Sequence, residues 1–231
     1  MQLGGATWPE IAATEGRCLL AVPIGSLEQH GPHLPLDTDT RIAVELAARL
    51  ACRRPDVVVA PPLAYGASGE HAAFPGTLLI NHSALAEMLV ELVRSARSSF
   101  AGVILICGHG GNAEALATAS TRCRAEGDAV LAWFAAPPGG DAHAGRTETS
   151  LMLAIDPAVV RNGLAVAGRT DPIEVLLPRL RAEGVRPVSS NGVLGDPRGA
   201  SAEEGAGLLG ALADDLGAAV AARWPLVQQP T

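Results

Sequence analysis

Short apolar runs alternate along the chain with longer segments in which apolar residues recur every three or four positions. The short runs are continuous, which is typical of strands buried on both faces of a parallel sheet. They predict strands over Leu19–Ile24, 57–60, Gly102–Cys107 and 129–135. The longer segments have the helical period. They predict helices over 39–51, 83–98, 112–126, 148–155 and 202–223.

This alternation predicts an α/β fold, a three-layer α/β/α sandwich with a mostly parallel central sheet. We expect residues 1–231 to form a single domain, since no linker or repeat interrupts the pattern. In such sheets ligands bind beyond the carboxyl ends of the strands, and the loops 25–39 and 108–112 both follow such ends. Residues 187–201, rich in Gly, Pro and Ser, are the best candidate for an excursion or lid.

Composition narrows the chemistry. All 17 basic residues are arginine, and the absence of lysine excludes Schiff-base catalysis, pyridoxal-phosphate catalysis and a Walker phosphate loop. The net charge is −7 without a basic stripe, which argues against a nucleic-acid partner. No apolar run reaches membrane-spanning length and no secretory signal is visible. We therefore expect a cytoplasmic protein without a membrane partner. The four cysteines form no metal-binding or redox pair.

The densest chemistry lies in residues 25–39, which read Gly-Ser-Leu-Glu-Gln-His-Gly-Pro-His-Leu-Pro-Leu-Asp-Thr-Asp. The side chains in it that can ligate a metal are Glu28, His30, His33, Asp37 and Asp39. Glu28 and His30 are two residues apart, so an extended backbone would point them to one side. Carboxylates and imidazoles suit zinc, manganese or ferrous iron, and no thiolate is present. The stretch therefore predicts a catalytic metal site with open positions.

Three further loops carry candidate residues. His109 lies in Gly-His-Gly-Gly-Asn between the clearest strand and a helix, for which Asn112 is a good N-cap. The second loop holds Glu70 and His71, and the third holds His143 and Glu148. A hydrogen-bonded side chain without a metal stays an open interpretation for His33 and His71, and Asp37 could simply brace its turn.

Together these motifs resemble the creatininase family of metal-dependent amidohydrolases. The matching stretches, in the family's order, are 25–39, Gly-Glu-His…Phe-Pro-Gly-Thr at 69–77, Gly-His-Gly-Gly-Asn at 108–112 and His-Ala-Gly…Glu-Thr-Ser at 143–150. The resemblance implies the creatininase-like fold, hydrolysis of C–N amide bonds and two divalent metal ions, with zinc, iron and manganese all open. It also implies a homo-oligomer.

The resemblance also implies a ligand set. Glu28, Asp39 and His109 would hold one metal ion; His30, Asp39 and Glu148 would hold the other, with Asp39 bridging. Creatininase itself carries a glutamate where this chain has Gly111, so Glu148 takes the place of that ligand. As the catalytic residue, His143 would supply a proton to the leaving amine. The residues expected to bind substrate or support the ligands are His33, Asp37, Glu70, His71 and Asn112.

Within the family, motifs such as Gly-Val-Leu-Gly-Asp-Pro at 192–197 most resemble a peptidase branch. That branch implies a modified ribosomal precursor peptide as substrate, from which a C-terminal Val-Tyr dipeptide is released. One alternative is an amidohydrolase acting on a small cyclic amide. Another is a dinucleotide-binding module, based on Gly108-x-Gly110-x-x-Ala113 with Asp128 further on. A third is a non-catalytic metal-binding protein.

Overall fold

The computed structural model describes residues 1–226. Its sheet has four strands, all parallel, in the order β2-β1-β3-β4. The strands are β1 (Leu19–Ile24), β2 (Val57–Val59), β3 (Gly102–Cys107) and β4 (Val130–Phe134). All four predicted strands are confirmed, two of them trimmed at their ends. β1 and β3 pair along their full lengths, from Leu19 opposite Gly102 to Ile24 opposite Cys107.

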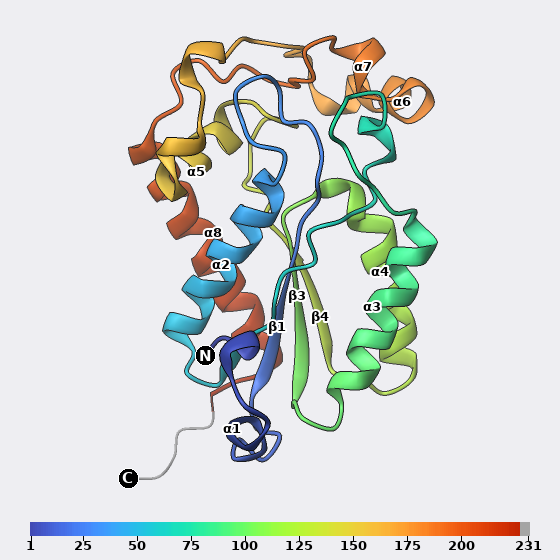
Figure 1. Ribbon diagram of the computed structural model, residues 1–231, viewed down its shortest axis with the longest axis vertical. Coiled ribbons are helices and arrows are strands. Elements are labelled where there is room, and N and C mark those ends of the chain that lie inside the picture. The colour runs from blue at the N-terminus through green and yellow to red at the C-terminus, as the bar shows by residue number, and fades with distance from the viewer. Residues whose placement is uncertain (227–231) are drawn as a thin grey trace.

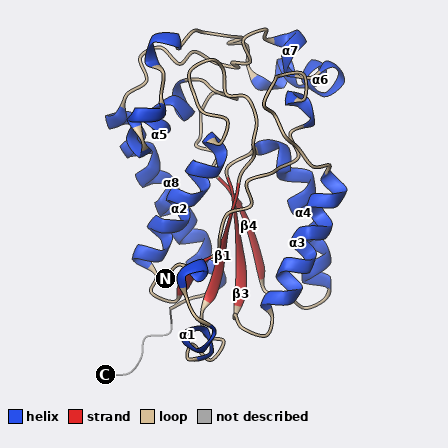
Figure 2. Cartoon of the chain, in the orientation of Figure 1, coloured by secondary structure: helices blue, strands red, loops and turns tan. Residues whose placement is uncertain are grey.

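Helices cover both faces of this sheet (Figure 1). On one face lie α2 (Thr38–Arg53), α5 (Arg146–Ile155) and α8 (Ala202–Arg223). On the other lie α3 (His82–Ala96) and α4 (Ala113–Ala125). The predicted α/β/α sandwich is therefore confirmed, and Figure 2 shows the strands enclosed between the two helical layers.

Smaller elements complete the chain. They are α1 (Trp8–Ala12), α6 (Ile173–Glu183), α7 (Val185–Val188) and the 3-10 turns η1 (Leu3–Gly5), η2 (Gly69–His71), η3 (Gly110–Asn112), η4 (Pro157–Val159) and η5 (Asn162–Leu164). The sequence pattern missed α6, which contains Pro178 and buries only Leu176 and Leu180. A proline within a helix removes one backbone hydrogen bond, so the pattern there is a weak helix signal.

The two helical layers enclose separate cores because successive strand side chains point to opposite faces. From β1, Leu19 and Ala21 pack in the core beneath α2 and α8. Leu20, Val22 and Ile24 pack in the core beneath α3 and α4. Burial on both faces explains why the strand sequences are continuously apolar.

Helix α8 differs from the sequence expectation about membranes. By length and composition it is the one helix in residues 1–226 that could span a bilayer. However, Leu209, Leu212, Leu216 and Val220 are buried in the core shared with α2 and α5. Packing within the protein therefore explains the apolar side of α8. Length and composition alone are weak evidence that a helix spans a membrane.

The carboxyl ends of the four strands lie at one edge of the sheet, toward the top of Figure 1. The loops that follow β1, β2 and β3 and the loop before α5 meet there. Residues 187–201 are irregular beyond α7, but they do not extend away from the protein. Val193 and Leu194 are buried, and Leu194 pairs with His143 in an antiparallel bridge. This segment therefore forms part of the wall around that edge.

Candidate metal centre

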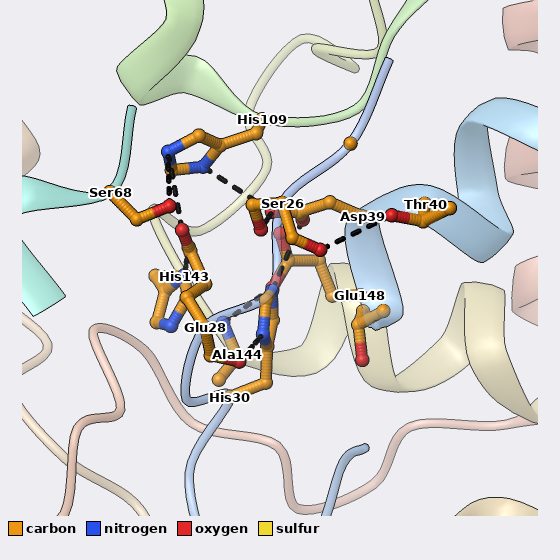
Figure 3. A network of polar contacts seen from close by, with 12 residues as sticks. Ser26, Glu28, His30, Asp39, Thr40, Ser68, His109, His143, Ala144 and Glu148 are labelled. Carbon is orange, nitrogen blue, oxygen red and sulfur yellow. Dashed lines mark hydrogen bonds and ion pairs between the residues drawn. The ribbon is translucent and has the colours of Figure 1, made fainter. Parts of the chain in front are cut away.

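The loop after β1 supplies two adjacent candidate ligands. Glu28 and His30 are both fully buried and reach the same pocket of polar side chains (Figure 3). The Nδ1 of His30 lies 3.1 Å from the carbonyl oxygen of Glu28, to which it donates. When Nδ1 of a neutral ring carries the proton, the lone pair lies on Nε2, which can then bind a metal. Metal-binding histidines commonly donate their other N–H to a backbone carbonyl in this way.

Asp39 lies in the first turn of α2, where the helix dipole favours a carboxylate. Its Oδ1 is 3.1 Å from Nε2 of His30, and its Oδ2 is 3.3 Å from Nδ1 of His109. Ser26 donates a 2.6 Å hydrogen bond to Oδ2. One carboxylate thus stands between two histidines that come from different strands' loops (Figure 3).

The Glu28 carboxylate is buried without a hydrogen-bond partner on either oxygen. Its Oε2 lies 3.2 Å from Nε2 of His109, and its Oε1 lies 3.3 Å from Nε2 of His71 and 3.8 Å from Nδ1 of His143. These are ion-pair distances without hydrogen-bond geometry. A buried, unpartnered carboxylate surrounded by imidazoles is costly unless a cation completes it.

His143 comes from the loop before α5, and Glu148 comes from the first turn of that helix. Glu148 accepts a 2.6 Å hydrogen bond from the backbone N–H of Ala144, and its Oε2 lies 3.9 Å from Nε2 of His30. His143 donates from Nε2 to the carbonyl oxygen of Gln29 at 2.7 Å. Ala144 has a left-handed backbone with φ 51°, which is unusual for a residue with a side chain. This turn lies between His143 and the start of α5, which carries Glu148.

Within residues 1–226, three groups of side chains place their donor atoms within 4.8 Å of one another. They are Glu28 with Asp39 and His109; His30 with His143 and Glu148; and Glu28 with His71 and His143. The first is the set expected for one metal ion. In the second, His143 stands where the expectation had Asp39, although Asp39 still contacts His30.

Burial and charge shift the acid–base properties of these groups. Burial raises the pKa of Glu28 to about 7, and it raises that of Glu148 to about 7 as well, against the lowering effect of nearby histidines. Burial works to lower the pKa of His30, but Asp39, Glu148 and Glu28 outweigh it and raise that pKa to about 10. The pKa of His109 is likewise raised to about 10, mainly by Glu28 and Asp39 against burial.

The two other histidines shift in the opposite direction. Burial, with the charge of His109 and His30, lowers the pKa of His71 to about 3. Burial, with the charge of His30 and His71, holds the pKa of His143 well below its usual value. The pocket therefore separates His30 and His109, in which neighbouring carboxylates outweigh burial, from His71 and His143, in which burial and the charge of other histidines prevail and keep the rings neutral at pH 7.

The remaining predicted residues fall into two groups. His33 is buried with its Nε2 2.9 Å from the Thr149 hydroxyl, next to Glu148, and Oε1 of Glu70 lies 3.7 Å from Nε2 of His109. Asp37 instead pairs with Arg41 one helical turn on, at 2.8 Å, and contacts none of the candidate ligands. The Asp37 side chain makes no capping hydrogen bond to α2, so its one role here is the ion pair with Arg41.

Asn112 does not act as the predicted side-chain N-cap, since its side chain makes no bond to α4. Its Oδ1 accepts from the Ala67 N–H at 2.8 Å, and its Nδ2 donates to the Gly25 carbonyl at 3.0 Å. The amide therefore ties the His109 loop to the loops that bear Glu28 and His71.

The sequence analysis did not identify Ser26 or Gln29 as site residues. In the structure Ser26 bonds to Asp39, and Gln29 contacts His71. Both residues lie inside the 25–39 motif, so their position among the ligands was the available signal.

The dinucleotide-binding alternative is contradicted by position. Asp128 precedes β4, at the edge of the sheet opposite His109, and pairs with Arg97. The glycines have another explanation, because a Cβ at Gly108 would overlap the backbone carbonyl oxygen of Asp39. Close approach of the β3 loop to α2 requires glycine there.

Known proteins share this arrangement of sequence and fold. The Creatininase family, described as creatinine amidohydrolase, matches residues 5–220. A mycofactocin precursor peptide peptidase of Mycolicibacterium smegmatis is 50% identical over 192 residues, which cover 81% of this chain and 78% of that protein.

Two solved creatininase structures have the same fold. One described as the Mn form has a TM-score of 0.80 at 27% identity, with 97% of this chain and 99% of that chain covered. A mutant described as the Zn-Zn type has a TM-score of 0.81 at 26% identity, with 97% and 98% covered. The chain belongs to the creatininase family.

Proposed function

We propose that this protein is a metal-dependent peptidase that hydrolyses a C–N amide bond in the modified mycofactocin precursor peptide and releases a C-terminal Val-Tyr dipeptide. The similarity to the Mycolicibacterium smegmatis peptidase supports the substrate. The observation that carries the chemistry is the Asp39 carboxylate, with one oxygen beside His30 and the other beside His109.

The donor set fits two divalent cations. Its atoms are carboxylate oxygens and imidazole nitrogens, which zinc, manganese and ferrous iron all accept. The unpartnered Glu28 oxygens supply an independent reason for a cation. We assign Glu28, Asp39 and His109 to one ion and His30, Asp39 and Glu148 to the other. The fold neighbours described as Zn-Zn and Mn forms are consistent with this donor chemistry.

Bound divalent cations would supply Lewis-acid polarisation of the scissile carbonyl and lower the pKa of a water. The protein's own residues then handle protons and geometry. His143 commits Nε2–H to the Gln29 carbonyl and turns Nδ1 toward the pocket. From Nδ1 it can take the proton of the attacking water and pass it to the leaving amine. Ser26 holds the Asp39 carboxylate in place.

The proposal extends to domain organisation, location, oligomeric state and partners. We propose that residues 1–231 act as one amidohydrolase domain in a cytoplasmic protein, and that this protein forms a homo-oligomer, as the family resemblance implies. The net charge of −7 supports a partner other than nucleic acid. The partner proposed here is the modified precursor peptide, with no membrane involved.

The decisive experiment is mass spectrometry of the metal-loaded protein incubated with the matured precursor peptide and, separately, with creatinine. Release of Val-Tyr that a chelator abolishes and added metal restores is the expected result. Creatinine turnover without dipeptide release would overturn the peptide assignment in favour of a small cyclic amide. Metal binding without either product would favour a non-catalytic protein.

A matched pair of variants tests the role of His143. His143→Ala should abolish turnover while both metal ions stay bound, because another residue set is proposed to ligate them. His82→Ala is the control, since His82 is exposed at the start of α3. Full activity in the His143 variant would refute its part in proton transfer.

A further inference from the structure

Gln29 lies between the candidate ligands Glu28 and His30, and its side-chain amide has a defined orientation. Its Oε1 accepts a 2.8 Å hydrogen bond from the Gly31 N–H. Its Nε2 donates to the Gly192 carbonyl oxygen at 3.1 Å. A flipped amide would place an oxygen against a carbonyl and an NH₂ against an N–H, so both contacts select the same orientation.

This orientation determines where His71 carries its proton. Nδ1 of His71 lies 2.8 Å from Nε2 of Gln29. An amide nitrogen only donates, so Nδ1 must present its lone pair, and the ring proton lies on Nε2. That Nε2 is the atom 3.3 Å from Oε1 of Glu28. His71 therefore offers the pocket an N–H and no lone pair.

The backbone of the same glutamine fixes His143 differently. Nε2 of His143 lies 2.7 Å from the Gln29 carbonyl oxygen, so it carries the proton. Nδ1, with the lone pair, is the atom that faces Oε1 of Glu28 at 3.8 Å. Because Nε2 of His143 carries its proton in this tautomer, the 3.1 Å approach to Nε2 of Gln29 brings two donors together and cannot be a hydrogen bond. Both amide hydrogens already point to Gly192 and His71.

Gly192 makes this arrangement possible. A Cβ there would overlap Oε1 of Gln29, and the residue has φ +81°. Two residues on, Leu194 N–H donates to the His143 carbonyl at 2.8 Å. The motif at 192–197 holds no proposed metal ligand. It contacts the Gln29 side chain through Gly192 and the His143 backbone through Leu194, and so holds both residues in place.

We propose that Gln29 is a positioning residue that gives His71 and His143 the same tautomer but opposite roles: His71 turns an N–H toward the Glu28 carboxylate, and His143 turns a lone pair into the pocket. Nε2 of His71 could ligate only if its proton moved to Nδ1, and the Gln29 amide N–H already occupies the lone pair there, so Gln29 excludes His71 from the metal ligands. The group Glu28, His71 and His143 is then not a third metal site, despite its short distances.

The catalytic meaning of these roles rests on the proposed function, but the tautomers do not. They are read from the metal-free protein by long-range ¹H–¹⁵N NMR of the histidine rings, followed by addition of Zn²⁺ alone. We expect a proton on Nε2 in both His71 and His143, and no zinc coordination shift at His71. A proton on Nδ1 of either ring, or zinc coordination by His71, would overturn the proposal.

Gln29→Glu tests the cause. A carboxylate oxygen opposite Nδ1 of His71 should draw the proton to that nitrogen, free Nε2 and make the His71 signal shift on zinc addition. Gln2→Glu is the matched control, because Gln2 is exposed and remote from the pocket. An unchanged His71 tautomer in folded Gln29→Glu protein would overturn the proposal.

Gly192→Ala provides a second route in case the carboxylate disturbs folding. It should displace Gln29 and remove the single defined tautomer of His71. Gly199→Ala is its control, since Gly199 has the same φ of +81° but a Cβ there would meet nothing closer than 3.4 Å. If the NMR pattern holds while Val-Tyr release fails, the peptidase assignment fails and the role of Gln29 stands.

Discussion

Asp39 places one carboxylate oxygen 3.1 Å from Nε2 of His30 and the other 3.3 Å from Nδ1 of His109. His30 follows β1, His109 follows β3 and Asp39 opens α2, so one side chain joins three elements. No other described carboxylate contacts both histidines in this way across residues 1–226.

Asp39→Asn should therefore lose both metal ions together, because an amide cannot bridge two cations as a carboxylate does. We expect activity to fall by more than the roughly 10- to 100-fold typical of outer-shell partners. Metal content by elemental analysis is the measurement. Asp37→Asn is the control, as that carboxylate pairs with Arg41. One retained ion per chain in Asp39→Asn would refute the bridge.

A substitution at Gly111 tests why this chain lacks the glutamate that creatininase carries at the same position. A Cβ at Gly111 would overlap Nε2 of His109 and lie 2.5 Å from Oε1 of Glu70. We expect Gly111→Ala to turn the His109 ring away and weaken zinc affinity by about 10- to 100-fold. Gly110→Ala, with open space around its Cβ, should leave the zinc titration unchanged. Equal affinities in both variants would show that the overlap is relieved without moving His109.

Asn112 offers a stability prediction. Removing its amide leaves the Ala67 N–H and the Gly25 carbonyl unpaired, at a cost of about 1–3 kcal/mol for each buried group. Asn112→Ala should lower both the free energy of unfolding and metal affinity, because three ligand-bearing loops lose a common tie. Asn81→Ala removes the cap of α3 and should cost about 1 kcal/mol with metal affinity intact. Chemical denaturation and zinc titration separate the two effects.

Metal affinity should rise with pH. Without metal, the pKa values of His30 and His109 are raised to about 10, so both rings are protonated at neutral pH. A cation must displace these protons, and lower pH opposes that displacement. We expect affinity to change by up to about tenfold per pH unit for each proton released. Calorimetry in buffers of different ionisation enthalpy counts the protons; binding without proton release would contradict these shifts.

The cysteines should react according to burial. Burial raises the pKa of the Cys107 thiol to about 12, beneath the His109 loop, and Cys123 is also buried. Cys52 is exposed on α2. Iodoacetamide at mildly alkaline pH should therefore label Cys52 and spare Cys107, since the thiolate is the reactive form. Peptide mass mapping gives the answer, and rapid labelling of Cys107 in folded protein would contradict its position under the site.

Local patterns were enough for the strands and for part of the site. Leu19–Ile24 and Gly102–Cys107 are identified by continuous apolar runs, because a parallel strand buries both faces. Glu28 and His30 share a pocket because they are two residues apart on an extended loop. Helix α6 was not predicted, since few of its residues are buried and Pro178 interrupts its pattern.

By itself, then, the sequence determined the layered fold, the loops that carry the chemistry and the kinds of ligand they hold. Only the tertiary structure decided which side chains meet across loops. It paired Asp39 with His109, separated Asp37 from the pocket and turned Asn112 from a cap into a tie between loops. The reason is physical: spacing along the chain orders neighbours within one loop. Distances between loops depend on strand order and on how closely α2 and the β3 loop pack.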